Sequence, residues 1–201
     1  MTHWRVPENW TVWSERVIDG VSVKFDHLRS FDMQLIKPAS NKWPLLKVTI
    51  RVVFDCHVVT ERYVQAKEGP AYWRDVGGHC RVFDPVRYKQ SLKLPELIEQ
   101  LPQGKISLYA AKSNNYMIWR PGGAAIDDPH YQVFFDLHKP AHRTNFLILY
   151  VQSAYLKTDP LATQRERKLA FGKVCAERLG LIPKSPKGRA KKKGMKAKNF
   201  V

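Results

Sequence analysis

Residues 130–155, HYQVFFDLHKPAHRTNFLILYVQSAY, contain the two strands that decide the fold. The first half alternates apolar and polar residues, the period of two that marks a strand with one buried face. Its apolar positions are Tyr131, Val133, Phe135 and Leu137. Residues 145–153 are apolar on both faces, as in a strand that is covered on both sides. A hairpin loop, KPAHRT, joins the halves, so the stretch predicts the centre of a sheet whose exposed face carries His130 and His138.

The rest of the chain predicts more strands and two helices. Short strands are expected at residues 21–25, 31–36, 106–110 and 116–119, and a longer one at 45–54 that buries Ile50, Val52 and Phe54. Residues 81–91 start extended and turn at Asp84-Pro85. Pro95 and an apolar stripe predict a helix in 94–104, and a capping box at Thr163 and Glu166 with Gly180 at the end predicts another over 161–179. The expected fold class is α+β, a mostly antiparallel sheet with two helices and a basic C-terminal tail.

Three regions are expected along the chain. Residues 1–20 form an aromatic-rich N-terminal arm, residues 21–182 a single α+β domain, and residues 183–201 a basic tail. The arm carries Trp4, Trp10 and Trp13, which either pin it onto the core or stack on nucleic-acid bases.

Composition narrows the class of protein. The chain has 201 residues and 44% hydrophobic side chains, enough for a folded domain with a core. No apolar run reaches the length of about 18 residues that a membrane span needs. The N-terminus lacks the basic-then-apolar pattern of a signal peptide, and three cysteines suit a reducing compartment, so a cytoplasmic location is expected.

Positive charge is the strongest functional signal. The chain has 34 Lys and Arg against 18 Asp and Glu, a net charge of +16. Residues 184–198 hold eight basic side chains and no acidic one, so half of the net charge lies outside the tail. Such an excess favours a polyanionic partner, because basic side chains neutralise phosphates and release counterions. A tail that only increases solubility is the simpler explanation, and an anionic membrane surface is disfavoured because the tail has little apolar content.

The sequence contains residues for two kinds of metal site, a zinc site and a carboxylate site. Cys56-His57 and His79-Cys80 offer zinc-type ligands, but neighbours in an extended chain point to opposite faces and do not converge on one ion. Asp127 and Asp128 could bind a catalytic cation, yet aspartates beside a proline are also expected from turn chemistry alone. No metal and no cofactor are therefore expected.

Metal-free cleavage of RNA requires fewer groups. One group takes the proton from the 2′-hydroxyl, another protonates the leaving oxygen, and a cation stabilises the phosphorane. His57 and Glu61 supply two proton carriers at the end of the strand over 45–54, and Arg81 and Arg87 follow as candidate phosphate ligands. For each residue taken alone, an ordinary solvated surface position is the better interpretation. Their combination with the net charge favours the nuclease hypothesis.

The segments FDPVRYKQSLKLPELIEQL, SNNY and YQVFFDL…FLILYVQSAY resemble small proteins from bacterial prophages and genomic islands. Their pattern of sheet and helix is in turn similar to the barnase, EndoU, colicin and RelE-like nuclease superfamily. The resemblance covers about residues 45–158 and implies metal-independent RNA cleavage by scattered His, Arg, Tyr, Lys or Glu residues. It assigns no catalytic position, because no motif aligns residue by residue.

The leading hypothesis is a nucleic-acid-binding protein of a bacterial mobile element, a toxin-type endoribonuclease with His57 as general acid or base. Aromatic residues on a sheet suit single strands, which favours RNA over DNA. The alternative is a non-enzymatic RNA- or DNA-binding component of a nucleoprotein or phage defence complex with protein partners, and the sequence leaves both open. The residues expected to bind nucleic acid are Tyr116, Tyr155, Arg165, Arg167, Lys168, Lys187, Arg189, Lys191, Lys192 and Lys193.

Overall fold

The computed structural model describes residues 13–39, 44–64, 73–110, 115–119, 128–158 and 168–183, and in 115–119 it describes the backbone alone. The elements of the first half are β1 (Arg16–Ile18), β2 (Val21–Val23), η1 (Asp26–Leu28), β3 (Phe31–Lys37), β4 (Leu46–Phe54), η2 (Cys56–Val58), β5 (Thr60–Arg62), β6 (Trp73–Arg74), β7 (Cys80–Phe83), α1 (Pro85–Ser91) and α2 (Leu94–Glu99). Those of the second half are β8 (Ser107–Ala110), β9 (Asn115–Trp119), β10 (His130–His138), β11 (Phe146–Lys157), β12 (Lys168–Leu169) and α3 (Phe171–Leu179).

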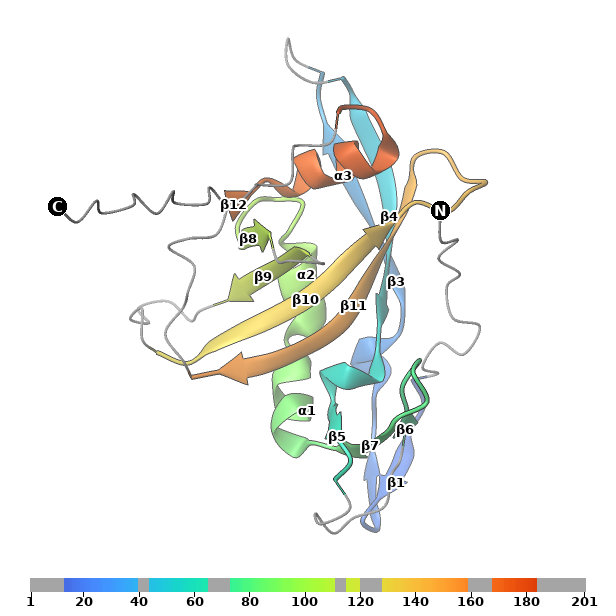
Figure 1. Cartoon of the computed structure of the whole chain (residues 1–201), viewed down its shortest axis with the longest axis vertical. Helices are drawn as coiled ribbons and strands as arrows, with labels where there is room; N and C mark the ends of the chain where they lie inside the picture. Colours follow the sequence, from blue (N-terminus) through green and yellow to red (C-terminus); the bar gives the residue numbers. More distant parts are fainter. Residues whose placement is uncertain are drawn as a thin grey trace, which may run out of the picture.

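The main structural element is a seven-stranded sheet in the order β12-β8-β9-β10-β11-β4-β3. All its pairs are antiparallel except β11 with β4, which run parallel with Phe146 opposite Thr49. The β10–β11 hairpin lies in the middle of the sheet (Figure 1), with a register shift between Phe134 and Phe135. The α+β fold class and the central position of this hairpin are thus confirmed.

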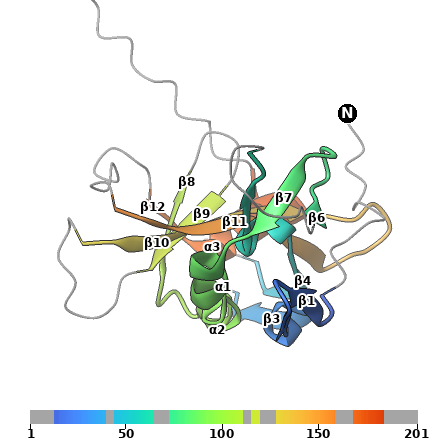
Figure 2. The same ribbon diagram turned by 90° about the horizontal axis from the view of Figure 1, so that it is seen from below.

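The core lies on one face of the large sheet. The four apolar positions of β10 are at most 1% exposed, and Ile50, Val52 and Phe54 of β4 are equally buried, as the alternation predicted. Figure 2 shows α1 and α2 on one side of β10 and β11 and strand β7 on the other. The apolar stripe of α2, including Leu94 and Ile98, joins the same core cluster.

The described residues contain three α-helices, where the sequence predicted two. Asp84 and Pro85 begin helix α1 instead of a simple turn, because the Asp84 carboxylate accepts hydrogen bonds from the Val86 and Arg87 backbone N–H groups. The prediction of a helix over 161–179 is wrong for its middle part: Lys168–Leu169 is a strand paired with β8, and α3 begins at Phe171. Thr163 and Glu166 lie outside the described residues. Gly180 ends α3 with a φ of 79°, as expected of a glycine cap.

The polar side of β10 is less exposed than its sequence predicted. His130 is 0% and Gln132 8% exposed, and their side chains lie 2.9 Å apart. The expected exposed, histidine-bearing face is therefore wrong at this end of the strand. A period of two identifies which residues alternate, but it does not show whether the second face is also covered.

The N-terminal part of the described chain packs onto the domain. Trp13 is 8% exposed and its ring lies 5.5 Å from that of Phe25, so this tryptophan does pin the chain to the core. Strands β1 and β2 form an unpredicted hairpin whose turn residues, Asp19 and Gly20, both have positive φ, as a type I′ turn requires. Trp4 and Trp10 lie outside the described residues.

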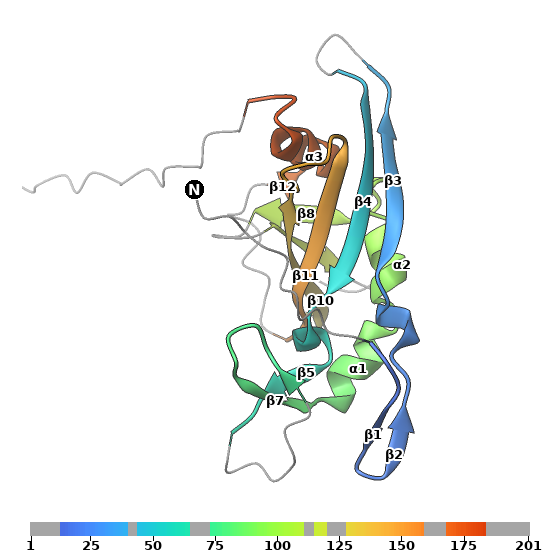
Figure 3. The same ribbon diagram turned by 90° about the vertical axis from the view of Figure 1, so that its right-hand side faces the viewer.

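A small sheet, β5-β7-β6, forms one end of the molecule. Figure 3 shows it together with β1 and β2 at one end of the large sheet, and α3 at the other. The chain enters this small sheet from β4 through η2 and leaves it into α1. Within the described residues, no helix is long and apolar enough to cross a membrane.

Candidate active site at the end of strand β4

The candidate site is built where β4 ends and the chain turns away from the sheet. The backbone N–H of Asp55 still pairs with the Val151 carbonyl of β11, at 2.9 Å, after which η2 begins. The Asp55 carboxylate caps η2 by accepting from the His57 backbone N–H at 3.0 Å. This turn fixes His57 beside the last residues of β4.

One carboxylate holds two histidines. Asp75 Oδ2 lies 3.1 Å from His57 Nε2, and Asp75 Oδ1 lies 3.1 Å from His79 Nδ1 and 2.9 Å from the His79 backbone nitrogen. The Asp75 side chain is 10% exposed, that of His57 31% and that of His79 63%. Solvent therefore reaches both imidazoles, while the carboxylate between them is only slightly exposed. We call these three residues the His–Asp–His cluster.

The carboxylate sets the tautomers of both rings. Burial raises the pKa of Asp75, but hydrogen bonds from the His79 backbone and from the two imidazoles outweigh it and lower the pKa to about 2. An ionised carboxylate only accepts hydrogen bonds, so His57 Nε2 and His79 Nδ1 must carry protons. In the neutral rings this leaves His57 Nδ1 and His79 Nε2 as the basic nitrogens, as the carboxylate of a catalytic triad does for its histidine.

A second carboxylate ties the turn to the sheet. The Tyr150 hydroxyl of β11 donates to Asp55 Oδ2, and Asp55 is 7% exposed. Burial, followed by the nearby Asp55 carboxylate, raises the pKa of Tyr150 far above its ordinary value, so the phenol stays protonated as a donor. Asp55 thus positions η2, and with it His57, against β11.

The turn also brings three metal-type donors together. Donor atoms of Asp55, Cys56 and His57 lie within 4.8 Å of one another, so the argument that adjacent ligands diverge does not apply here. It assumed an extended chain, whereas these residues form a 3-10 turn. Burial and the Asp55 carboxylate raise the pKa of the Cys56 thiol to about 12, so it carries a proton at neutral pH. A metal would have to displace that proton, and Asp55 already accepts from Cys56, His57 and Tyr150.

Of the second pair of zinc-type residues, His79 shares the Asp75 carboxylate with His57, whereas Cys80 lies apart. Cys80 is on β7 opposite Arg74 and is not part of this group. Of the two aspartates considered for a catalytic cation, Asp128 is exposed and Asp127 lies outside the described residues.

Both predicted catalytic arginines adjoin the cluster. Arg81 is 8% exposed and its guanidinium donates to the Thr60 hydroxyl and carbonyl oxygens, at 2.8 and 2.9 Å. Arg87 Nη1 donates to the carbonyls of His57 and Thr60, at 3.1 and 2.8 Å, while Nε pairs with Asp84. Arg81 is therefore a buried support of the turn. Arg87, with a side chain that is 24% exposed, is the one that a phosphate can reach.

The expected partner of His57 is replaced. Glu61 lies on β5 next to Thr60, whose side chain is buried against Arg81, so Glu61 points to the opposite face of that strand. His57 is paired with Asp75, eighteen residues along the chain, rather than with Glu61. The sequence signal for Asp75 and His79 was the turn Asp-Val-Gly-Gly-His, in which an aspartate accepts from a backbone N–H four residues later.

The aromatic residues expected to bind bases are only partly described. The Tyr155 ring stacks on Phe134 at 5.6 Å, and the Arg87 guanidinium lies 5.5 Å from its centre. The Tyr155 ring is thus already in contact with two protein side chains. For Tyr116 only the backbone is described, on β9 opposite Phe134. Lys168 is exposed on β12, and the other expected nucleic-acid ligands lie outside the described residues: Arg165, Arg167, Lys187, Arg189, Lys191, Lys192 and Lys193.

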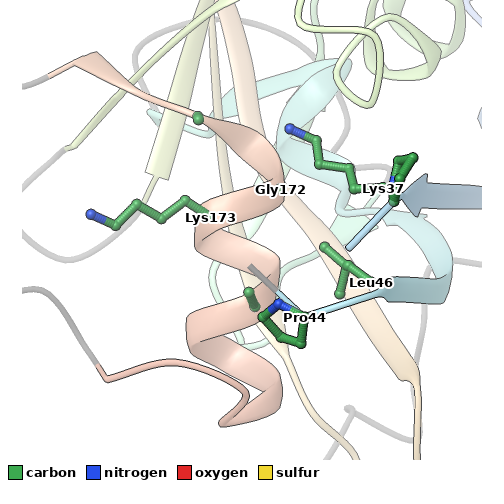
Figure 4. A pocket seen from close by; sticks show the side chains of 8 residues that line it. Lys37, Pro44, Leu46, Gly172 and Lys173 are labelled. Atoms are coloured by element: carbon green, nitrogen blue, oxygen red, sulfur yellow. The ribbon is translucent and has the colours of Figure 1, made fainter. Parts of the chain in front are cut away.

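A pocket of about 270 Å³ lies at the other end of β4, between that strand and α3. Figure 4 shows Lys37 beside Gly172, while the amino group of Lys173 extends away from the pocket. No predicted site residue lines it. Its walls are Lys37, Pro38, Pro44, Leu46, Ala170, Gly172, Lys173 and Ala176.

Comparison with known proteins gives one finding. Residues 15–179 match the YjaZ family, a range that includes the large sheet, the small sheet and the His–Asp–His cluster. No curated protein and no solved structure matches the chain. Since the matched range is far more than half of the sequence, the chain belongs to the YjaZ family.

Proposed function

We propose that the protein binds RNA and cleaves its backbone by metal-independent acid–base catalysis at the His–Asp–His cluster. The observation that carries the proposal is the pair of accessible imidazoles held by one carboxylate, with Arg87 bonded to the backbone carbonyl of His57. The resemblance to the nuclease superfamily remains an expectation.

In the proposed reaction, His57 Nδ1 takes the proton from the 2′-hydroxyl, and the 2′-oxygen attacks the adjacent phosphorus. The bond to the 5′-oxygen breaks, and protonated His79 gives its Nε2 proton to that leaving oxygen. Arg87 stabilises the charge on the phosphorane by donating from Nη2. The hydrogen bonds and the ion pair of Arg87 within the described part of the chain use Nη1 and Nε. Asp75 remains ionised and orients both rings. Proton transfer by positioned groups of this kind contributes about 10²–10⁴-fold each.

The net charge of +16 supports a nucleic acid as substrate, since phosphate neutralisation gives affinity for any sequence. A non-enzymatic nucleic-acid-binding role is the second candidate. The observation in its favour is that most hydrogen bonds of Arg81 and Arg87 go to Thr60 and to backbone carbonyls, which describes a structural support.

The test is cleavage of labelled RNA in the presence of EDTA. His57→Gln keeps an N–H donor for Asp75 and removes the base, and His142→Ala is the control, because His142 is an exposed residue of the β10–β11 loop. We expect the wild type and His142→Ala to cut and His57→Gln to lose cleavage. Equal cleavage by His57→Gln would overturn the site. Salt-sensitive RNA binding without fragments would favour the non-enzymatic role.

A further inference from the structure

A cationic aromatic patch lies on the face of β4 and β11 that is opposite the main core. Arg143 lies with its guanidinium carbon 4.7 Å from the centre of the Phe146 ring, and that of Arg51 lies at 5.8 Å. Arg51 and Arg143 are exposed and Phe146 is half-buried. We call these three residues the Arg–Phe–Arg patch.

The patch is held in place before any ligand binds. Arg51 Nε and Nη2 donate to the two carboxylate oxygens of Asp32, at 2.8 and 2.9 Å. The hydrogen bonds from Arg51 lower the pKa of Asp32, so this ion pair is present at neutral pH. It holds the guanidinium beside Phe146, while 44% of the Arg51 side chain stays exposed. A planar group held in one orientation loses less freedom when a base stacks on it.

The register connects the patch with the His–Asp–His cluster. Phe146 is opposite Thr49, Ile148 opposite Arg51 and Tyr150 opposite Val53, so Phe146 and Tyr150 point to the same face of β11. Tyr150 donates to Asp55, which caps the turn that carries His57. At a rise of about 3.3 Å per residue, the patch lies roughly 13 Å along the strand from Tyr150. This separation suits one strand of a few nucleotides.

The charge of this surface suits a phosphate backbone. Lys47 is exposed and lies on the same face of β4 as Thr49 and Arg51. Asp32 is the acidic side chain that contacts the patch, and its two oxygens are occupied by Arg51. Lys47 and Arg143 therefore remain as cations for phosphates, beside a ring and a guanidinium plane for a base.

We propose that the Arg–Phe–Arg patch is a nucleotide subsite for single-stranded RNA, occupied by a nucleotide that flanks the bond cut at His57. The inference rests on the proposed function and specifies its substrate class. The exposed guanidinium groups of Arg51 and Arg143 can stack on the face of an unpaired base, which a duplex does not offer. The neighbouring cations bind the phosphates on either side of that base.

The test measures binding separately from cleavage. The probe is a fluorescent 2′-O-methyl oligonucleotide of twelve nucleotides, which has no free 2′-hydroxyl to attack, next to the same sequence as a duplex. The variant is Arg51→Ala/Arg143→Ala. The matched control is Lys89→Ala/Lys105→Ala, which removes the same charge from exposed positions on α1 and after α2. Thermal unfolding of both variants checks that they fold.

We expect the patch variant to bind the single strand about tenfold more weakly and to reduce the slope of log affinity against log salt by about one per lost phosphate contact. The control should keep the wild-type slope. Phe146→Leu should weaken binding of the single strand without changing the slope. Equal losses in the patch and control variants would overturn the subsite, and equal losses for duplex and single strand would overturn the substrate class. Because the probe is not cleaved, loss of the nuclease proposal would leave this result unaffected.

Discussion

Replacing Asp75 by Asn tests the role of the shared carboxylate most directly. The side chain keeps its shape and loses its charge, so both histidines lose an ionised acceptor. The difference between the ordinary pKa of 3.8 and a folded-state pKa of about 2 corresponds to about 2 kcal/mol of stability at neutral pH. We expect Asp75→Asn to lower the free energy of unfolding by about that amount at pH 7.

The pH dependence distinguishes this effect from a general loss of packing. The pKa of Asp75 is lower in the folded than in the unfolded protein, so its ionised form stabilises the fold. This contribution is complete above about pH 5, and it is lost as the pH falls through the unfolded value and then toward about 2. The difference in stability between wild type and Asp75→Asn should therefore shrink from pH 5 to pH 2.

Urea unfolding at several pH values, followed by the fluorescence of the buried Trp13 and Trp73, measures this difference. Other carboxylates titrate in both proteins, so they largely cancel in the comparison. A stability difference that stays constant between pH 7 and pH 2, or no difference at pH 7, would refute the reasoning. In a cleavage assay, Asp75→Asn should lower the rate by about 10²-fold or more, because an amide N–H facing one imidazole would select the wrong tautomer.

Three further substitutions test the fold. Gly180→Ala should destabilise by about 1 kcal/mol, because the α3 cap has a φ of 79°, and a shift of the thermal midpoint would measure it. Asp84→Ala should cost about 1 kcal/mol in urea unfolding by removing the α1 cap, whereas Asp84→Asn should keep most of it. Leu149→Ala should cost about 2–5 kcal/mol, because Leu149 is 0% exposed at the sheet centre, and an unchanged urea midpoint would contradict the assigned core.

The sequence predicted the strands well where apolar and polar residues alternate. It predicted the helices less well, because capping signals alone do not fix where a helix begins. The alternation of β10 and β4 placed Val133 and Ile50 in the core correctly. Over nine residues, a period of two indicates a strand with one buried face, because a helix repeats every 3.6 residues. The helix expected over 161–179 was too long, since the pairing of Leu169 with Leu108 of β8 is a tertiary contact that local propensity does not report. Asp84-Pro85 and Asp19-Gly20 were readable signals of a helix start and a hairpin, and both were missed.

Two residues of the candidate site were predictable from the sequence, but the carboxylate that contacts His57 was not. His57 was identified from its position after a strong strand and Arg87 as a candidate phosphate ligand further along the chain, and the structure bonds Arg87 to the His57 carbonyl. Asp75 was not, because its contact with His57 depends on how the β5–β7–β6 sheet folds back on η2. Arg81 was assigned to a phosphate although it is buried, since a strand of four residues does not show from its sequence which side chains face inward.

The parallel pairing of β4 with β11 joins segments that are separated by about half of the chain, with Thr49 next to Phe146 and Phe54 next to Val151. During synthesis, β4 has to wait for β11 to leave the ribosome, and contacts between such distant segments make folding slow. The hydrogen bond from Tyr150 to Asp55 can form only after β11 has been made. A nascent chain that ends before β11 therefore lacks the strand that positions the turn of His57. Under the proposed function, the chain would be unable to cut its own messenger or ribosomal RNA until β11 has left the ribosome.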